Sequence, residues 1–138
     1  MITLPDILVV DDEPAVRRAL RMSLEPRGFS VSTAQNGREA LRELCTRSSE
    51  DRQYDAIILD IVMPDIDGWE VLRAIQNNPL WKHIPVVVIS GFAHDSRAYT
   101  QVTRFNAILV EKREDFVEMV GEVLDRMLAA PAEEPREF

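Results

Sequence analysis

The chain has 138 residues, of which 46% are hydrophobic and 29% charged, and this is the size and composition of one soluble globular domain. Its formal net charge of −8 argues against nucleic-acid binding by this domain, because neutralising phosphates requires clustered Lys and Arg. No apolar run approaches the roughly 20 residues of a membrane span, and Met1 leads almost directly into a strand-like segment without a basic leader. The sequence therefore predicts a cytoplasmic protein without membrane contact.

Short apolar runs rich in β-branched residues alternate along the chain with longer stretches of helical period. This alternation is typical of an α/β fold, a doubly wound parallel sheet with helices on both faces. We expect five strands, at residues 7–10, 29–34, 56–59, 86–89 and 108–110. A helix is expected after each strand, and the fourth helix is expected between about Asp95 and Phe105.

Apolar residues at helical spacing predict which face of each helix is buried. The first helix presents Val16, Leu20 and Leu24, and Pro26 and Gly28 end it. The second follows a turn at Asn36-Gly37, precedes a polar loop at 48–53, and has a stripe that we expect to include Cys45 as a small core residue: Ala40, Leu41, Leu44 and Cys45. The third spans about 69–76, and the last has a strong stripe: Phe116, Met119, Val120, Val123, Leu124 and Met127.

The domain is expected to cover residues 1–130. Residues 131–138 are acidic and contain Pro135, which is typical of a frayed tail or the start of a linker. The sequence leaves open whether the chain is a stand-alone protein or part of a larger one.

Polar residues stand where four of the five strands end. Asp11 and Asp12 follow the first strand, Asp60 the third, Ser90 the fourth, and Lys112 lies just beyond the fifth. The carboxyl ends of parallel strands meet at one edge of the sheet, which is where ligands bind in such folds. We therefore expect three carboxylates, a hydroxyl and an ammonium to converge there.

Three carboxylates held together repel one another, and a bound cation relieves that repulsion. Oxygen ligands without His or Cys favour Mg²⁺, which keeps several waters and often a phosphate oxygen. Asp60 could then act as a nucleophile that forms an acyl phosphate, while Lys112 pairs with the anion and Ser90 donates a hydrogen bond to it.

Each of these residues has an ordinary structural explanation when it is taken alone. Asp12-Glu13-Pro14 is a good helix start, Lys112 a common type of surface lysine, and Ser90-Gly91 a common loop. Their joint placement at four strand ends of one sheet is what favours a functional site.

Three segments resemble the motifs of the receiver domains of bacterial two-component response regulators. They are Ile7–Pro14 with its Asp-Asp-Glu-Pro, Ile58–Gly68 around Asp60, and Val88–Gly91. The resemblance covers nearly the whole chain, and it implies the chemotaxis-type, flavodoxin-like strand order 2-1-3-4-5.

The resemblance also implies roles for individual residues. Asp60 would be the phosphoacceptor, Asp11 and Asp12 would bind Mg²⁺ directly or through water, and Val62 would add a backbone carbonyl to the metal. Ser90 would be the switch hydroxyl, and Lys112 would contact the phosphoryl group.

The implied function is signalling, and the domain would be no enzyme beyond assisting its own phosphorylation and dephosphorylation. The phosphoryl donor would be a phosphohistidine on a sensor histidine kinase or a histidine phosphotransfer protein. A downstream protein would bind the face formed by the fourth helix, fifth strand and fifth helix.

Three features bear on how such a domain would behave. Arg113 follows Lys112 where the family commonly has a cis proline, and Leu109 stands where a switch aromatic is usual. We expect output to depend on helix or loop movement instead of an aromatic rotamer. Val62 and Phe92 are apolar residues flanking the expected path of attacking water, which predicts slow dephosphorylation.

Other functions are less well supported. A degenerate receiver that acts as a phosphorylation-independent scaffold is the main alternative. An aspartyl phosphatase would need a general acid two residues after Asp60, where Val62 stands. Nucleotide or flavin binding would need a Gly-rich loop after the first strand, and none is present.

Overall fold

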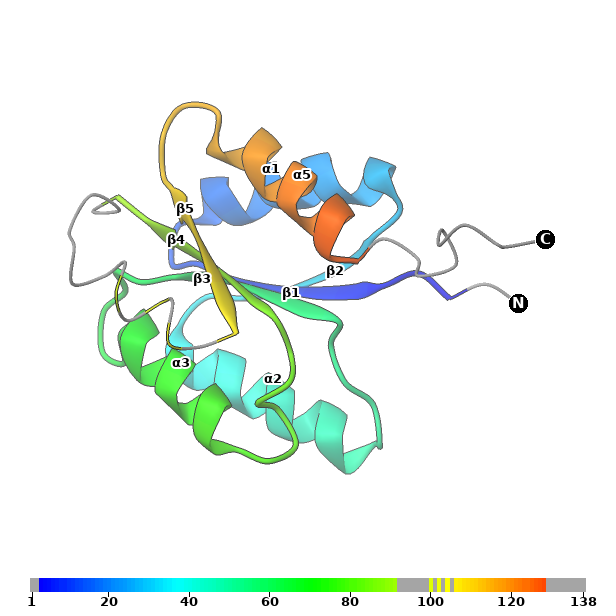
Figure 1. Cartoon of the computed structure of the whole chain (residues 1–138), viewed down its shortest axis with the longest axis vertical. Coiled ribbons are helices and arrows are strands. Elements are labelled where there is room, and N and C mark those ends of the chain that lie inside the picture. Colours follow the sequence, from blue (N-terminus) through cyan, green and yellow to red (C-terminus); the bar gives the residue numbers. More distant parts are fainter. Residues whose placement is uncertain (1–2, 92–99, 101, 103, 105, 129–138) are drawn as a thin grey trace.

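The computed structural model describes residues 3–91, 100, 102, 104 and 106–128. Five parallel strands form one sheet in the order β2-β1-β3-β4-β5 (Figure 1), which confirms the expected fold class and strand order. The strands are β1 (Asp6–Val10), β2 (Ser30–Ala34), β3 (Ala56–Asp60), β4 (Val86–Ser90) and β5 (Ala107–Glu111).

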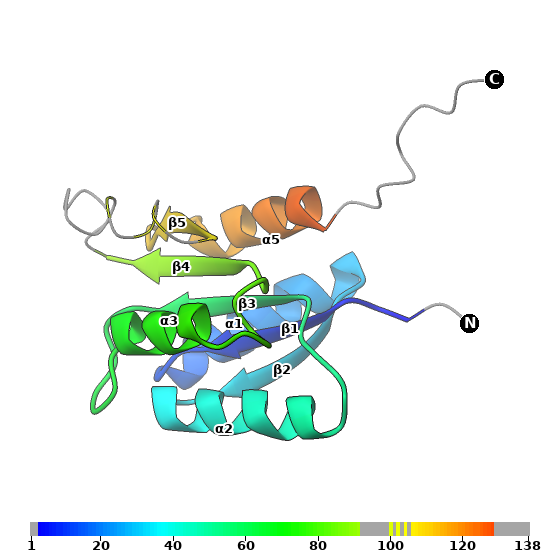
Figure 2. The ribbon, with the colours of Figure 1, turned by 60° about the horizontal axis from the view of Figure 1, so that its bottom comes forward.

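Helices cover both faces of the sheet. Among the described residues they are α1 (Pro14–Leu24), the short η1 (Glu25–Arg27), α2 (Gly37–Ser49), α3 (Gly68–Asn77) and α5 (Phe116–Met127). Helices α1 and α5 lie on one face, and α2 and α3 on the other (Figures 1 and 2). Most of the helix expected at 95–105 lies outside the described residues, as does the 131–138 tail. Within the described residues, every helix is too short or too polar to cross a bilayer.

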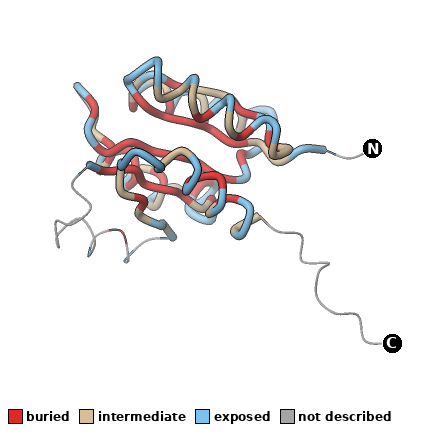
Figure 3. Tube along the Cα trace, turned by 90° about the horizontal axis from the view of Figure 1, so that it is seen from above, coloured by how far each residue is buried: buried red, intermediate tan, exposed pale blue. Residues whose placement is uncertain are grey.

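The three central strands are buried on both sides, as the unbroken apolar runs predict (Figure 3). Successive side chains alternate between the two layers: in β1, Leu8 and Val10 pack toward α2 and α3, whereas Ile7 and Val9 pack toward α1 and α5. Two hydrophobic cores thus hold the sheet from both faces and fix the positions of its strand ends.

Side-chain caps set where two helices begin. Asn36 accepts a hydrogen bond from the Glu39 amide at 2.8 Å, so Asn36-Gly37 is the start of α2 and not a separate turn. Asp67 and Glu70 form a reciprocal capping box at the start of α3. Helix α2 also continues to Ser49, into the segment expected to be a loop, and Trp81 donates a hydrogen bond to the hydroxyl of Ser48 at 2.9 Å.

Two predictions about buried helix positions were wrong. Cys45 is exposed, and Met119 is 40% exposed. Each residue turns an α-helix by about 100°, and Cys45 lies one such step beyond Leu44, past the edge of the buried stripe. On α5, Val117 is half-buried against the core, whereas Met119 faces solvent.

Gly68 allows α3 to begin directly against the end of β3. Its amide donates to the Ile61 carbonyl at 2.9 Å, and a Cβ at this position would meet the Asp60 carbonyl oxygen and come within 2.5 Å of the Ile61 Cα. These are backbone atoms at the end of a buried strand, so they have little room to move.

We therefore expect Gly68→Ala to lower the free energy of unfolding by about 1 to 3 kcal/mol, the usual cost of overpacking a tight site. Gly91→Ala is the matched control, because an added Cβ there has no described neighbour within 4 Å. Urea unfolding of both variants would measure the difference. Equal stability of the two variants would contradict the proposed close approach.

Candidate functional site

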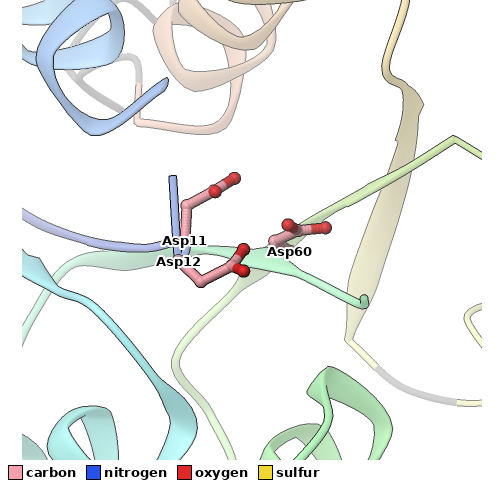
Figure 4. A group of neighbouring side chains, drawn as sticks. All are labelled: Asp11, Asp12 and Asp60. Atoms are coloured by element: carbon pink, nitrogen blue, oxygen red, sulfur yellow. The ribbon is translucent and has the colours of Figure 1, made fainter. Parts of the chain in front are cut away.

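Three carboxylates meet at the carboxyl edge of the sheet. Asp11 and Asp12 follow β1, and Asp60 is the last residue of β3. One carboxylate oxygen of each lies within 4.8 Å of those of the other two (Figure 4). Asp11 and Asp60 are buried, whereas Asp12 is exposed. The structure thus brings together the acidic residues that the sequence analysis selected.

Backbone hydrogen bonds continue past the strand ends and hold the site. The Ile61 amide donates to the Ile89 carbonyl at 3.1 Å, and the Lys112 amide donates to the Ser90 carbonyl at 2.9 Å. Ser90, which is buried, ends β4 at the same edge of the sheet. Lys112 is therefore fixed by its main chain beside the ends of β3 and β4.

The Lys112 ammonium lies among three carboxylates. Its Nζ is 3.0 Å from Glu13 Oε1, 3.4 Å from Asp11 Oδ2 and 3.4 Å from Asp60 Oδ2. The Asp60 carboxylate also accepts a hydrogen bond from the Val62 amide, at 3.3 Å. One cation thus links the first, third and fifth strand ends, although the chain separates Asp11 and Lys112 widely.

A cavity of about 440 Å³ opens over Asp60. Six residues line it: Asp12, Glu13, Asp60, Val62, Gly91 and Lys112. Val62 is 56% exposed at this cavity, and Phe92, its expected apolar partner, lies outside the described residues. The cavity gives solvent and small anions a route to the Asp60 carboxylate.

Burial and neighbouring negative charge raise the pKa values of two of these carboxylates, Asp11 and Asp60. Burial, followed by the charge of Asp11, raises the pKa of Asp60 to about 6 despite the nearby Lys112 ammonium. Burial also raises the pKa of Asp11, against the opposing hydrogen bond from the Glu13 amide and the charge of Lys112. For Lys112, burial alone would lower the pKa, but the hydrogen bond to Glu13 and the charges of Asp11 and Asp60 outweigh it and raise the pKa.

The donor set fits a hard divalent cation. All three groups are carboxylates, their oxygens are close enough to share one ion, and the cavity leaves space for waters. A bound cation would also reduce the repulsion among the carboxylates, which the Lys112 ammonium offsets only in part. Asp11, Asp12 and Asp60 are therefore the residues that could hold Mg²⁺.

The comparisons with known proteins point to one family. Residues 7–124 match the model of the response regulator receiver domain. The chain belongs to this family. It is a receiver domain of the kind found in two-component signal transduction.

Curated relatives agree with this assignment. The receiver domain is 46% identical over 85 residues to the response regulator MprA of Mycolicibacterium vanbaalenii, a match that covers 62% of this chain and 34% of the relative. It is 33% identical over 127 residues to an uncharacterized 14.6 kDa protein of Leptolyngbya boryana, covering 91% of this chain and 92% of the relative. The chain spans about a third of the length of the first curated relatives that it matches.

Solved structures show the same fold. The response regulator TrrA of Thermotoga maritima, in complex with Mg²⁺-BeF, is 33% identical and matches with a TM-score of 0.73 over 91% of this chain and all of that one. The phosphorylated cyanobacterial phytochrome response regulator RcpA is 27% identical, with a TM-score of 0.79 over 92% of this chain and 96% of that one.

The contact between Glu13 and Lys112 was not predicted from the sequence. Glu13 was assigned only to a helix start, yet its carboxylate makes the shortest contact of Lys112. Its position directly after the acidic pair at a strand end was the available signal. A second omission is Arg17, whose guanidinium donates to the Asp11 carbonyl at 2.7 Å and so fastens α1 to the site.

The raised pKa of Asp60 predicts a pH-dependent gain in stability for Asp60→Asn. With a folded-state pKa of about 6 and an ordinary value of 3.8, Asp60 lowers the stability of wild type as pH rises through this range, and the Asn variant lacks this contribution. In EDTA we expect the two proteins to be similarly stable near pH 4, and the variant to be more stable by about 1 to 3 kcal/mol near pH 7.

Urea unfolding at a series of pH values would measure this difference. Asp51→Asn is the control for removing a carboxylate, because Asp51 is exposed and its positive φ of 59° suits Asn. A constant difference between wild type and Asp60→Asn from pH 4 to 8 would contradict the burial argument.

Proposed function

We propose that this receiver domain accepts a phosphoryl group on Asp60 in a Mg²⁺-dependent reaction in the cytoplasm and relays that state through a conformational change. The observation that carries the proposal is the position of Asp60: its carboxylate faces an open cavity, beside the Lys112 ammonium and within reach of two further carboxylates. A nucleophile, a cation that can pair with an anion, and a set of metal ligands therefore lie in one place.

Each residue has a distinct part in this proposal. An Asp60 oxygen forms the bond to phosphorus while the bond from phosphorus to the donor's imidazole nitrogen breaks, and the electron pair returns to the ring. Lys112 pairs with a phosphoryl oxygen, and the Ser90 hydroxyl turns to donate a hydrogen bond to another. Asp11, Asp12 and Asp60, together with the Val62 carbonyl, would hold Mg²⁺, which neutralises charge on the transferring group when it is bound.

The comparisons support this chemistry by analogy. One similar structure is that of a phosphorylated response regulator, and another is that of a response regulator in complex with Mg²⁺-BeF. We infer a phosphohistidine donor on a sensor histidine kinase or a histidine phosphotransfer protein, since the family receives its phosphoryl group from such partners.

The surface of β5 and α5 is the proposed site for a downstream protein. Ile108 on β5 and Met119 on α5 are large apolar residues that are 41% and 40% exposed. Leu109 packs partly buried against the core that faces α2 and α3, and it has no ring that could swing inward. We therefore propose that the phosphorylated state reaches this surface through backbone movement after β4 and β5.

The first test is binding of beryllium fluoride, a phosphoryl mimic, with and without Mg²⁺. We expect binding that requires Mg²⁺, that is lost in Asp60→Asn, and that changes amide chemical shifts in β5 and α5. Asp55→Asn is the control, because Asp55 lies outside the cavity, near the amino end of β3. The absence of binding by wild type would favour the phosphorylation-independent scaffold instead.

The exposed Val62 side chain predicts slow loss of the phosphoryl group. A valine at this edge of the cavity offers no hydrogen bond to an attacking water, whereas an amide would. We expect Val62→Asn to speed dephosphorylation roughly tenfold, the equivalent of one hydrogen bond of about 1.4 kcal/mol in the transition state.

Decay of the radiolabelled phosphoprotein would measure this rate. Val62→Leu is the control, since it changes the volume of the side chain without adding a hydrogen-bonding group. Equal decay rates for the Asn and Leu variants would argue against a role for Val62 polarity.

A further inference from the structure

The hydrogen bonds of Lys112 leave its ammonium without a spare donor. A lysine ammonium has three N–H groups, and three carboxylates lie within hydrogen-bond distance of Nζ: Asp11, Glu13 and Asp60. If Lys112 binds a phosphoryl oxygen, as proposed above, it must give up one of these three partners. Which partner it gives up determines how the hydrogen bonds of Lys112 rearrange on phosphorylation.

Burial distinguishes the three carboxylates. The side chains of Asp11 and Asp60 are 1% and 5% exposed, and both belong to the proposed metal group. The Glu13 side chain is 60% exposed, so water can solvate its carboxylate when Lys112 leaves. Breaking the contact between Lys112 and Glu13 leaves no buried charge unpaired. Breaking the contact with Asp11 or Asp60 leaves a buried carboxylate without its partner.

The side chain of Glu13 can also leave Lys112 without disturbing the helix that follows. Glu13 occupies the N-cap position of α1, yet its side chain makes no capping hydrogen bond, and Pro14 supplies the helix start. Glu13 lines the cavity over Asp60, and its carboxylate contacts Lys112 at 3.0 Å, the shortest of the three distances. The flexible side chain thus places a removable anion at the cavity.

We propose that Glu13 is a positioning residue whose carboxylate occupies the place of a phosphoryl oxygen on Lys112 in the resting domain. It holds the ammonium beside Asp60 and is displaced into solvent when the phosphoryl group arrives. This inference rests on the proposed phosphorylation of Asp60 and deepens it. Glu13 thereby competes with the phosphoryl group and slows phosphorylation.

The kinetic test compares Glu13→Gln and Glu13→Asp with wild type, using acetyl phosphate and saturating Mg²⁺. Removing an ion pair with one exposed partner should speed phosphorylation about two- to fivefold in Glu13→Gln. Glu13→Asp should behave in the same way, because its carboxylate is one methylene too short to hold Lys112. A Glu13→Asp rate equal to that of wild type, beside a faster Glu13→Gln, would mean that Glu13 only repels the anionic donor, and would overturn the proposal.

A double-mutant cycle with Lys112→Ala provides the second criterion. If Glu13 acts through Lys112, Glu13→Gln should have no effect on the rate in the Lys112→Ala background. The same two- to fivefold gain in both backgrounds would also overturn the proposal. Glu50→Gln is the control for loss of an exposed carboxylate, because Glu50 pairs with Arg52 away from the cavity.

A direct observation of Lys112 separates this proposal from the function on which it rests. The chain has only two lysines, Lys82 and Lys112, so selective ¹³C and ¹⁵N labelling of lysine gives two side-chain signals. In the metal-free protein Glu13→Gln should shift the Lys112 signal and leave that of Lys82, which is exposed, unchanged. In the Mg²⁺-beryllium fluoride complex, the Lys112 signals of wild type and Glu13→Gln should coincide.

The two measurements fail in different ways. If wild type neither binds beryllium fluoride nor becomes phosphorylated, the proposed function is wrong, whatever the lysine signals show. If wild type does both but the Lys112 signal in the metal-free protein does not respond to Glu13→Gln, the proposal for Glu13 is wrong and the proposed function stands.

Discussion

The site depends on one constraint, the burial of two carboxylates beside a single ammonium at the edge of a parallel sheet. Asp11 and Asp60 lose most of their hydration there, and Lys112 offers both of them a hydrogen bond at 3.4 Å. One positive charge does not offset three or four negative ones, and the raised pKa of Asp60 reflects the imbalance. The residual negative charge explains why this edge of the sheet would attract a cation.

Packing of the sheet holds the strand ends in place despite this excess of negative charge. Apolar side chains on both faces of β1, β3 and β4 anchor the strands, and the hydrogen bonds from Ile61 to Ile89 and from Lys112 to Ser90 extend the order past the strand ends. The burial of two hydrophobic cores therefore offsets the free-energy cost of ionising the buried carboxylates. A rigid sheet also keeps the charged groups from relaxing apart.

Much of this arrangement could be predicted because it repeats along the sequence. Polar residues stand at or just beyond the ends of four of the five apolar runs, and parallel strands bring such ends together, so the group containing Asp11, Asp60 and Lys112 followed from the pattern. The contact of Lys112 with Glu13 did not, since it depends on how two flexible side chains meet across the cavity. Cys45 and Met119 were misassigned for a related reason: residues at the border of an apolar stripe are buried or exposed according to the neighbouring helix, which periodicity does not specify.

Under the proposed function, the same electrostatics set an order of events. A phosphoryl donor carries negative charge, and the cavity that it must enter is lined by Asp12, Glu13 and Asp60, with Lys112 already engaged by carboxylates. Approach of an anion to this group is unfavourable until some of the negative charge is neutralised. A cation bound by Asp11, Asp12 and Asp60 would neutralise part of this charge, while Lys112 would still be paired with Glu13. Metal binding would thus precede phosphorylation, and the exchange of Glu13 for the phosphoryl group would be the step that follows it.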